Sequence, residues 1–263
     1  MTATALPETC AAVSTLWVSP ATAVYLGAPL GLAPHSTSVH CLVLGVDGPI
    51  TVRVPGRGDI VGRSVLVPPR EVHQVISTDE SRILFCYSDA TAGRGRDLLD
   101  AMGERTGGFG VRHRAESALI DLCAGDAPGG ADILRTAFPA PDRPLDARIA
   151  RTVERILREP TRSADELAQA ESLSRAHFLR LFGAQTGTSF RRYRLWARML
   201  HAAAAIADGA DLTRAAADAG FASPSHFSDS FLRMFGLTAT TLTRSGATLV
   251  VSDDPSGWAE VAA

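Results

Sequence analysis

The sequence of 263 residues contains no lysine and no asparagine, so all 26 of its basic residues are arginine. Contacts with a polyanion therefore depend on arginine, histidine, hydroxyl groups and backbone N–H groups. The chain has only four cysteines, widely spaced and without a Cys-x-x-Cys pair. This pattern excludes a disulfide scaffold and a zinc ribbon and favours a reduced, cytoplasmic compartment. The chain lacks any run of about 18 apolar residues, which excludes a membrane span, and its first residues lack the basic stretch of a secretory signal.

What the sequence does contain is an uneven distribution of charge around a net value of −2. Residues 1–142 hold 11 arginines and 15 acidic residues, whereas residues 143–246 hold 15 arginines and 10 acidic residues. Residues 247–263 hold three acidic residues and no arginine. A basic segment attached to an acidic one indicates nucleic-acid binding by the basic part. We therefore expect an N-terminal domain at 1–142, a nucleic-acid-binding domain at 143–246 and an acidic tail at 247–263.

The N-terminal domain begins with the pattern of a β-structure. Short apolar or alternating segments follow one another, separated by Gly and Pro at short intervals. The predicted strands are Val39–Val46, Ile50–Val54, Ser64–Val67 and Ile83–Tyr87. Short strands with regular turn signals predict a sandwich or a small barrel.

After residue 90 the pattern changes to helices. Segments Arg96–Met102 and Arg114–Cys123 have helical spacing, and Asp132–Ala137 predicts a short helix inside a stretch rich in Gly, Pro and Asp. We place the domain boundary near Pro141–Pro144 because proline punctuates the chain there. The helices between Arg96 and Cys123 are the candidate dimer contacts.

The C-terminal domain is predicted to be helical throughout. Apolar residues recur at helical spacing from Ile149 to Leu157. Ser163 and Glu166 fit a capping box at the start of the next helix. Ser189–Ala207 predicts a long helix, and Ser223 followed by a proline is a strong helix start.

An internal repeat with an offset of 49 residues organises this domain. The identical pairs are Ala168/Ala217, Ala170/Ala219, Ser174/Ser223, His177/His226, Phe178/Phe227, Phe182/Phe231 and Gly187/Gly236. Each copy has a short helix with small residues, a capped second helix with a Phe pair on one face, and a glycine at the position of a helix C-cap. Each copy therefore predicts a helix-turn-helix unit, and the long helix joins the two.

On these residues the C-terminal domain resembles the two-fold helix-turn-helix domain of the AraC/XylS family of transcription regulators. The resemblance covers residues 165–244 and is most specific in the stretch GFASPSHFSDSFLRMFGLT. Leu212, Ala215, Ala216 and Ala239 are mild departures from the family pattern. The resemblance implies a regulator in which the second helix of each unit enters the major groove of DNA.

The resemblance also implies which residues contact DNA. Candidates for base contacts lie in the first turns of the two recognition helices: Arg175, Ala176, His177, Leu179, Arg180, Pro224, Ser225, His226 and Asp229. Arg180 is the strongest, because arginine can bond bidentately to guanine. Asp229 departs from the arginine often found there. Candidates for phosphate contacts are Thr188, Ser189, Arg191, Arg192 and Arg233.

The N-terminal domain resembles the cupins more loosely. Gly62, Pro68 and His73 follow the second cupin motif, with Arg70 in place of a usual glycine. The first motif is broken, because Thr37 stands where its second histidine belongs. The candidate residues for an effector pocket are His35, His40 and His73. The same three histidines could supply metal ligands, but the broken pattern favours an organic effector, or a barrel that only dimerises. We expect no cofactor.

Signatures of enzymes are absent: the chain has no GxxxxGK[ST], HExxH or GxSxG motif.

The predicted fold class is α+β, with a cupin-like β-barrel followed by helices, then an all-α domain with two helix-turn-helix units joined by a long linker helix. The predicted function is a cytoplasmic, sequence-specific DNA-binding transcription regulator, a homodimer that acts on a double-stranded operator under a small-molecule effector and contacts RNA polymerase. The alternatives are a metal-dependent cupin enzyme and a ligand-independent dimeric regulator.

Overall fold

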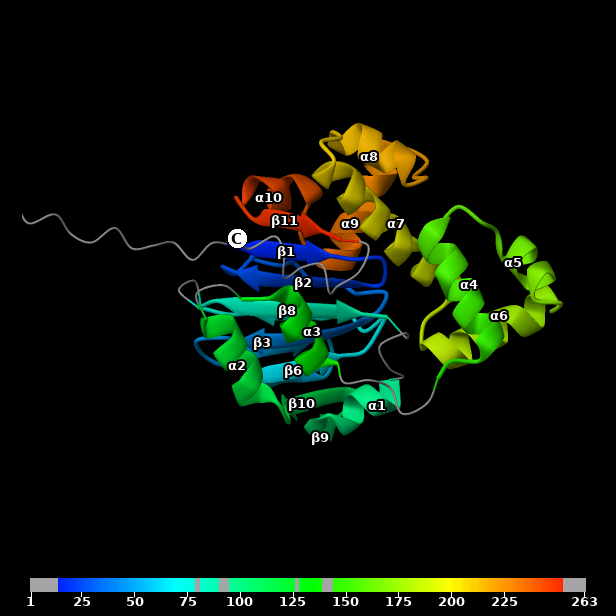
Figure 1. The fold of residues 1–263 in the computed structure, drawn as a ribbon. Coiled ribbons are helices and arrows are strands. Elements are labelled where there is room, and N and C mark those ends of the chain that lie inside the picture. Colours follow the sequence, from blue (N-terminus) through cyan, green and yellow to red (C-terminus); the bar gives the residue numbers. More distant parts are fainter. Residues whose placement is uncertain (1–13, 79–80, 90–94, 126–127, 139–143, 253–263) are drawn as a thin grey trace, which may run out of the picture.

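The computed structural model describes residues 14–78, 81–89, 95–125, 128–138 and 144–252. A sheet-rich N-terminal part is followed by a helical C-terminal part (Figure 1). Most of the predicted boundary at Pro141–Pro144, the first cysteine, Cys10, and the end of the predicted tail lie outside the described residues.

The N-terminal part contains two sheets. Its strands are β1 (Thr15–Val18), β2 (Thr22–Gly27), β3 (His40–Gly45), β4 (Ile50–Val54), β5 (Gly58–Gly62), β6 (Ser64–Val67), β7 (Gln74–Ile76), β8 (Ile83–Ser88), β9 (Met102–Thr106) and β10 (Phe109–His113). The large sheet has the order β11-β1-β2-β8-β3-β6-β10-β9, where β11 (Thr248–Val251) comes from the C-terminal end. Its pairs are antiparallel except β1 with β11, which run parallel. The small sheet has the order β5-β4-β7.

The central strands of the large sheet are covered on both faces. Strands β2, β3, β6 and β8 are buried along their whole length, which explains their nearly continuous apolar sequences. One face packs against α1 (Gly95–Asp100), α2 (Glu116–Ala124) and α3 (Gly130–Ala137) (Figure 1). The other face packs on the small sheet and, further along, on C-terminal helices.

The C-terminal part consists of α4 (Ala147–Arg158), α5 (Ala164–Ala170), α6 (Arg175–Thr186), α7 (Phe190–Ala207), α8 (Leu212–Asp218), α9 (Pro224–Phe235) and α10 (Ala239–Arg244). Helices α5 and α6 form the first helix pair, and α8 and α9 form the second. Helix α7 runs between them (Figure 1).

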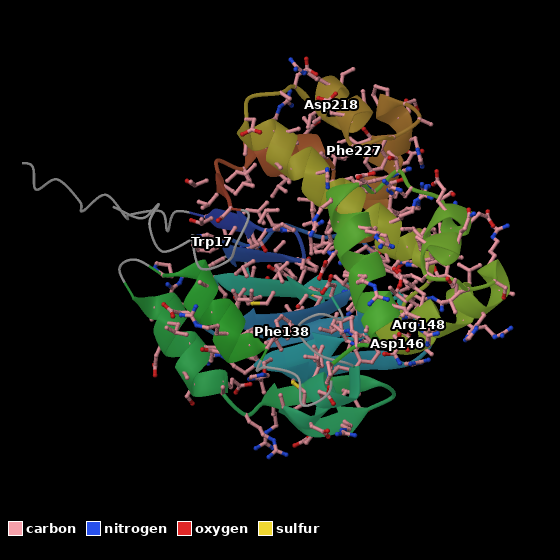
Figure 2. The ribbon with its side chains drawn as sticks, turned by 45° about the vertical axis from the view of Figure 1, so that its right-hand side comes forward. Trp17, Phe138, Asp146, Arg148, Asp218 and Phe227 are labelled. Atoms are coloured by element: carbon pink, nitrogen blue, oxygen red, sulfur yellow. The ribbon has the colours of Figure 1, made fainter. Side chains whose placement is uncertain are left out.

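The helix ends follow local sequence signals. The predicted capping box is confirmed: Ser163 Oγ accepts from the Glu166 N–H at 3.2 Å, and the Glu166 carboxylate accepts from the Ser163 N–H at 2.7 Å. Asp146 caps α4, its carboxylate accepting from the Arg148 N–H at 3.0 Å (Figure 2). Both predicted C-cap glycines adopt the left-handed conformation, Gly187 with φ 71° and Gly236 with φ 77°. These caps satisfy backbone groups that a helix end leaves unpaired.

The two helix pairs differ in what they bury. The first pair and α4 share a core of their own, which includes Ile149, Phe178 and Phe182. The core of the second pair is continuous with the interior face of the large sheet, so that Phe227 and Phe85 belong to one apolar cluster. Consistently, α8, α9 and α10 lie over β1 and β11, whereas α4, α5 and α6 form a separate lobe (Figure 1).

Several predicted elements are confirmed, and others were wrong. The strand Ile50–Val54 and the long helix ending at Ala207 have the expected bounds. The helix expected at Arg96–Met102 ends at Asp100, because Met102 begins a hairpin of β9 and β10 that occupies the middle of the proposed dimer segment. Residues 248–251, assigned to an acidic tail, form β11, because their backbone pairs in parallel with β1 and Val250 is buried against the sheet region.

Candidate nucleic-acid interface and adjoining cavity

The N-terminal turns of α6 present the base-contact candidates of the first unit. Ser174 caps the helix, its Oγ accepting from the His177 N–H at 3.3 Å. Phe178 and Phe182 face inward and are fully buried. The same helix exposes all five candidates: Arg175, Ala176, His177, Leu179 and Arg180. The two buried phenylalanines thus fix the orientation of α6, and its solvent-facing side carries two guanidinium groups, those of Arg175 and Arg180.

Helix α9 presents the corresponding surface of the second pair. Ser223 caps it, accepting from the His226 N–H at 3.1 Å, and Phe227 is buried. The candidates Pro224, Ser225 and Asp229 are exposed. The fourth candidate, His226, is half-buried, and its ring packs edge-on against Phe221 at 5.5 Å. The first turns of α9 therefore expose hydroxyl and carboxylate groups rather than arginine, and the arginine of this helix, Arg233, lies in its last turn.

Helix α7 sets the separation between the two surfaces. It contains 18 residues, which corresponds to a length of about 27 Å. Along its inner side Tyr193, Trp196 and Ala197 are buried. The helix pairs at its two ends are therefore held by a rigid, packed spacer.

The phosphate candidates divide into exposed and buried groups. Ser189, Arg191 and Arg233 are exposed. Thr188 is 3% exposed and does not face solvent. The Arg192 guanidinium donates to the Ser36 carbonyl at 2.6 Å, the Ser36 hydroxyl at 2.9 Å and the Thr37 carbonyl at 3.0 Å. The expectation that Arg192 and Thr188 face phosphate therefore fails in this arrangement, because the N-terminal part covers the start of α7.

Further contacts join the N-terminal part to the second helix pair. The Ala33 N–H donates to the Gly236 carbonyl at 2.8 Å, and the Ser36 N–H donates to the Arg233 carbonyl at 3.1 Å. The Tyr193 hydroxyl donates to the buried Asp89 carboxylate. Residues 33–37 thus form a docking loop that holds the helical part against the sheets. Contacts between residues so far apart in sequence have no local signal.

The three histidines of the loose cupin resemblance are buried, and two of them meet. His35 and His73 form a backbone bridge with two N–H···O bonds of 2.9 Å, and their rings lie 4.4 Å apart. Burial lowers the pKa of His35 and of His40 to about 4 and lowers that of His73. Within the described part of the chain no three His, Cys, Asp or Glu residues form a cluster that could hold a metal.

The cysteines of the described residues are free and buried: Cys41, Cys86 and Cys123. Burial raises the pKa of Cys123 to about 12. All three pack as small apolar side chains in the two apolar clusters of the sheet region.

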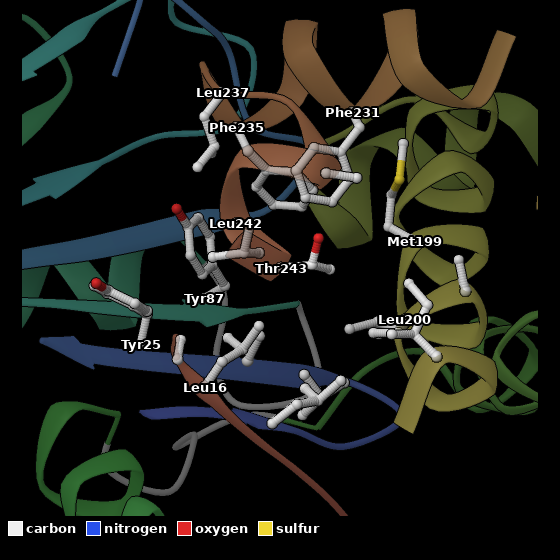
Figure 3. Close-up of a pocket in the computed structure, with 18 of the residues that line it drawn as sticks. Leu16, Tyr25, Tyr87, Met199, Leu200, Phe231, Phe235, Leu237, Leu242 and Thr243 are labelled. Carbon is white, nitrogen blue, oxygen red and sulfur yellow. The ribbon is translucent and has the colours of Figure 1, made fainter. Parts of the chain in front are cut away.

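A cavity of about 410 Å³ lies between the large sheet and the second helix pair (Figure 3). Strands β1, β2 and β8 contribute residues such as Leu16, Tyr25 and Tyr87. Helices α7, α9 and α10 contribute residues such as Met199 and Phe231. None of the three candidate histidines lines this cavity, so the residues proposed for an effector pocket are not those around it.

A difference between the two copies of the sequence repeat indicates this cavity. At the end of α6 the first copy has Gln185 and Thr186, whereas the second copy has Met234 and Phe235 at the equivalent positions. Met234 is buried, and Phe235 lines the cavity. The extra apolar residues of α9 indicate a second surface that covers this helix.

Comparison with known proteins identifies the helical part and the fold. Residues 167–245 match the family model of a helix-turn-helix domain. No curated protein sequence matches the chain. No described helix is long and apolar enough to cross a membrane.

Among solved structures the chain is similar to ToxT from Vibrio cholerae. The structure of ToxT bound to a methylnaphthyl-butenoic acid has a TM-score of 0.55 at 12% identity, with 86% of this chain and 98% of ToxT covered. A second ToxT structure has a TM-score of 0.54 at 12% identity, with 84% and 95% covered. Wild-type ToxT bound to an unsaturated fatty acid has a TM-score of 0.50 at 12% identity, with 86% and 91% covered. At this identity the similarity establishes the fold.

Proposed function

Because residues 167–245 are a helix-turn-helix domain of the AraC type in a chain with the fold of ToxT, we propose that this protein is a sequence-specific DNA-binding transcription regulator. The observation that carries the proposal is the pair of exposed helix starts, α6 and α9, at the two ends of α7. Successive turns of one major groove lie about 34 Å apart. The α7 spacer, about 27 Å long, would set the separation of the two helices, and we propose that both address one face of the duplex.

In this proposal the exposed residues take two roles. Arg180 and its neighbours in the first turns of α6 read base edges, and guanine is the expected partner of Arg180. Ser189, Arg191 and Arg233 hold phosphates and set the register without reading sequence. Asp229 on α9 can accept a hydrogen bond from cytosine but repels phosphate, so we propose that the first pair contributes more to affinity than the second.

We also propose that a small molecule controls the regulator. Solved ToxT structures contain an unsaturated fatty acid or a synthetic butenoic acid. In this chain the cavity between the large sheet and the second pair is the candidate effector site, since its volume of 410 Å³ falls in the range of about 300–1,000 Å³ typical of small-molecule sites. An effector acts only through a difference in affinity for two arrangements of the protein.

Homodimerisation and contact with RNA polymerase complete the proposal. Two chains on one operator would place their helix pairs on neighbouring half-sites. Sedimentation of the purified chain, with and without operator DNA, tests the dimer. Co-purification with polymerase on promoter DNA tests the second contact.

The experiment that tests the function is DNA binding across a salt series. The purified chain is titrated with the DNA upstream of its own gene and with random DNA of equal length. We expect specific binding at least about 1,000-fold tighter than random binding at physiological salt and a steep fall of both affinities with salt. Equal affinity for both DNAs at every salt concentration, with and without cell extract as a source of effector, would contradict the proposal.

A further inference from the structure

The wall that the described residues form around the cavity carries no charge. All 24 lining residues are uncharged, and most are aliphatic or aromatic. The polar groups are the hydroxyls of Tyr25, Tyr87 and Thr243 and the indole N–H of Trp196. Burial raises the pKa of Tyr25 and of Tyr87 above the ordinary value, so both phenols stay neutral.

The hydroxyl groups of the wall already have partners. The Tyr25 hydroxyl donates to the Ala28 carbonyl at 2.7 Å, and the Thr243 hydroxyl donates to the Thr240 carbonyl at 3.1 Å. Tyr87 is hydrogen-bonded to the Cys41 thiol. These groups hold the wall in place and leave no donor of their own for a ligand anion.

Trp196 differs from them. Its side chain is 1% exposed, and its indole N–H has no hydrogen-bond partner among the residues that the structure describes. A buried donor without a partner is unfavourable, and such groups in native structures point to an acceptor that is supplied from elsewhere. Trp196 is one of the residues that line the cavity, so a bound molecule that reaches its indole N–H would supply this acceptor.

We propose that this cavity binds an uncharged, mainly apolar small molecule that carries a hydrogen-bond acceptor for Trp196, and that the bound molecule stabilises the docked arrangement of the second helix pair on the large sheet. The inference rests on the proposed function and gives its effector a chemical class. A long-chain alcohol, ketone or ester fits this description. A carboxylate does not, because an ion buried without a counter-charge is strongly disfavoured.

The effect on docking follows from the position of the walls. Leu16, Tyr25 and Tyr87 belong to the sheet, whereas Phe231 and Phe235 belong to the recognition helix α9 (Figure 3). A molecule between them contacts both parts only while they are docked. It therefore binds the docked arrangement more tightly than any separated one and shifts the population toward it.

Binding by the full chain is tested with decanol and decanoate, which differ at the head group. Each competes with the uncharged dye N-phenylnaphthylamine, whose fluorescence reports apolar surroundings. At about pH 8, where a carboxylic acid is ionised, we expect decanol to bind at least about 100-fold more tightly than decanoate. Equal or tighter binding of decanoate would overturn the ligand class, and absence of both dye and decanol binding would overturn the site.

Two pairs of variants locate the site. Ala203→Trp fills the cavity and should abolish dye binding, whereas Ala204→Trp, on the same helix but not on the wall, should retain it. Trp196→Phe removes the donor and should weaken decanol about 3- to 10-fold, while the affinity of the dye changes less than about twofold. If Ala203→Trp binds like the wild type, or if Trp196→Phe leaves decanol affinity unchanged, the assignment is wrong.

The docking effect has its own measurement. Decanol should raise the Tm of the wild type and of Ala204→Trp but not of Ala203→Trp, and it should slow hydrogen exchange in α9 and β1. Faster exchange in α9 on binding would overturn the docking part. DNA binding is measured separately on the same samples. Ligand binding without any DNA sequence preference would refute the proposed function but not the ligand site. Sequence-specific DNA binding without ligand binding would refute the ligand site but not the proposed function.

Discussion

Arginine replaces lysine throughout this protein, and the arginines differ in what they already bind. Arg180 and Arg191 are exposed on the helical part. Arg192 is bound to the docking loop, and Arg198 lies over the Phe221 ring at 6.0 Å. Sequence type alone does not separate these roles, because all four residues occupy amphipathic helices. Burial and partners do separate them.

Arg180→Ala should weaken binding to the operator by about 1–3 kcal/mol and relax the preference at one base pair, because a bidentate contact to guanine would be lost. Competition with operators mutated one base pair at a time measures the effect. Arg191→Ala is the matched control and should weaken binding to all sequences alike. Identical behaviour of the two variants would refute the division into base and phosphate contacts.

Arg192→Ala should destabilise the docked protein by about 1.5–3 kcal/mol, because hydrogen bonds from a charged group to the docking loop would be lost. This outcome replaces the phosphate role expected from the sequence. Urea unfolding measures the stability, and the salt slope of DNA binding should stay unchanged. A flatter salt slope with unchanged stability would restore the phosphate role.

At the scale of elements, the two C-cap glycines end equivalent helices in different surroundings. Both have positive φ. A Cβ at Gly236 would lie 2.5 Å from the Ala33 carbonyl oxygen, whereas the nearest atom to a Cβ at Gly187 is 3.9 Å away, on the His40 ring. Both copies of the repeat therefore require glycine for the positive φ at the helix end. Only Gly236 must also lack a side chain, because the docking loop lies close to it.

Gly236→Ala should cost more stability than Gly187→Ala. Both variants carry the strain of an alanine at positive φ, about 1 kcal/mol, and Gly236→Ala in addition forces the docking loop away. Chemical unfolding of both variants gives the difference, and hydrogen exchange at Ala33 and Ser36 should rise only in Gly236→Ala. Equal losses of stability and equal rates of hydrogen exchange in the two variants would show that the docking loop accommodates the added methyl group of Gly236→Ala at no cost.

Ser223→Ala should destabilise α9 by about 1 kcal/mol, because the cap bond to the His226 N–H would be lost. Ser228→Ala, an exposed serine in the interior of the same helix, is the control and should change stability by a few tenths of a kcal/mol. Thermal unfolding by circular dichroism measures both. A loss no larger than that of Ser228→Ala would mean that solvent replaces the cap.

The elements with local signals were predictable, and those that depend on distant partners were not. The capping serines and the Phe pairs located the helices of the C-terminal part within a residue or two. Strand β11 was missed because its partner β1 lies more than 200 residues away in the sequence. The base-contact candidates that the resemblance implies on α6 are exposed. Arg192 is instead bound to the docking loop, and such a contact leaves no trace in a local sequence pattern.

At the scale of the whole molecule, the two parts share one interior. The apolar cluster that includes Phe85 of the sheet also includes Trp196, Phe227 and Met234 of the helical part. The first pair, by contrast, has its own core. The position of the second pair therefore depends on the N-terminal part, while the first pair packs around a core of its own.

The free energy of unfolding should decrease as the pH is lowered, because the buried histidines resist protonation in the folded state. Burial lowers the pKa of His35 and His40 to about 4, whereas the unfolded chain keeps histidine near about 6.5. The unfolded state therefore binds protons first, so the stability present above about pH 6.5 is lost progressively as the pH falls toward about 4. Urea unfolding at a series of pH values measures this decline.

His40→Gln removes one of these titratable side chains. Between about pH 4 and pH 6.5 it should reduce the slope of the unfolding free energy against pH by up to about 1.4 kcal/mol per pH unit. His177→Gln, at an exposed site on α6, is the control and should leave the slope as in the wild type. An unchanged slope in His40→Gln would mean that this histidine does not contribute to the acid sensitivity.

The pairing of β11 with β1 has a consequence for how the protein can open. The chain leaves the N-terminal part before α4 and returns to it at β11, so the helical part is a closed loop fastened at both ends. When the second pair separates from the sheet, the β11 anchor keeps it at a high effective concentration near its docking surface. Any separation of the second pair from the sheet is therefore limited by this anchor, and an operator that binds the separated pair competes with an intramolecular partner.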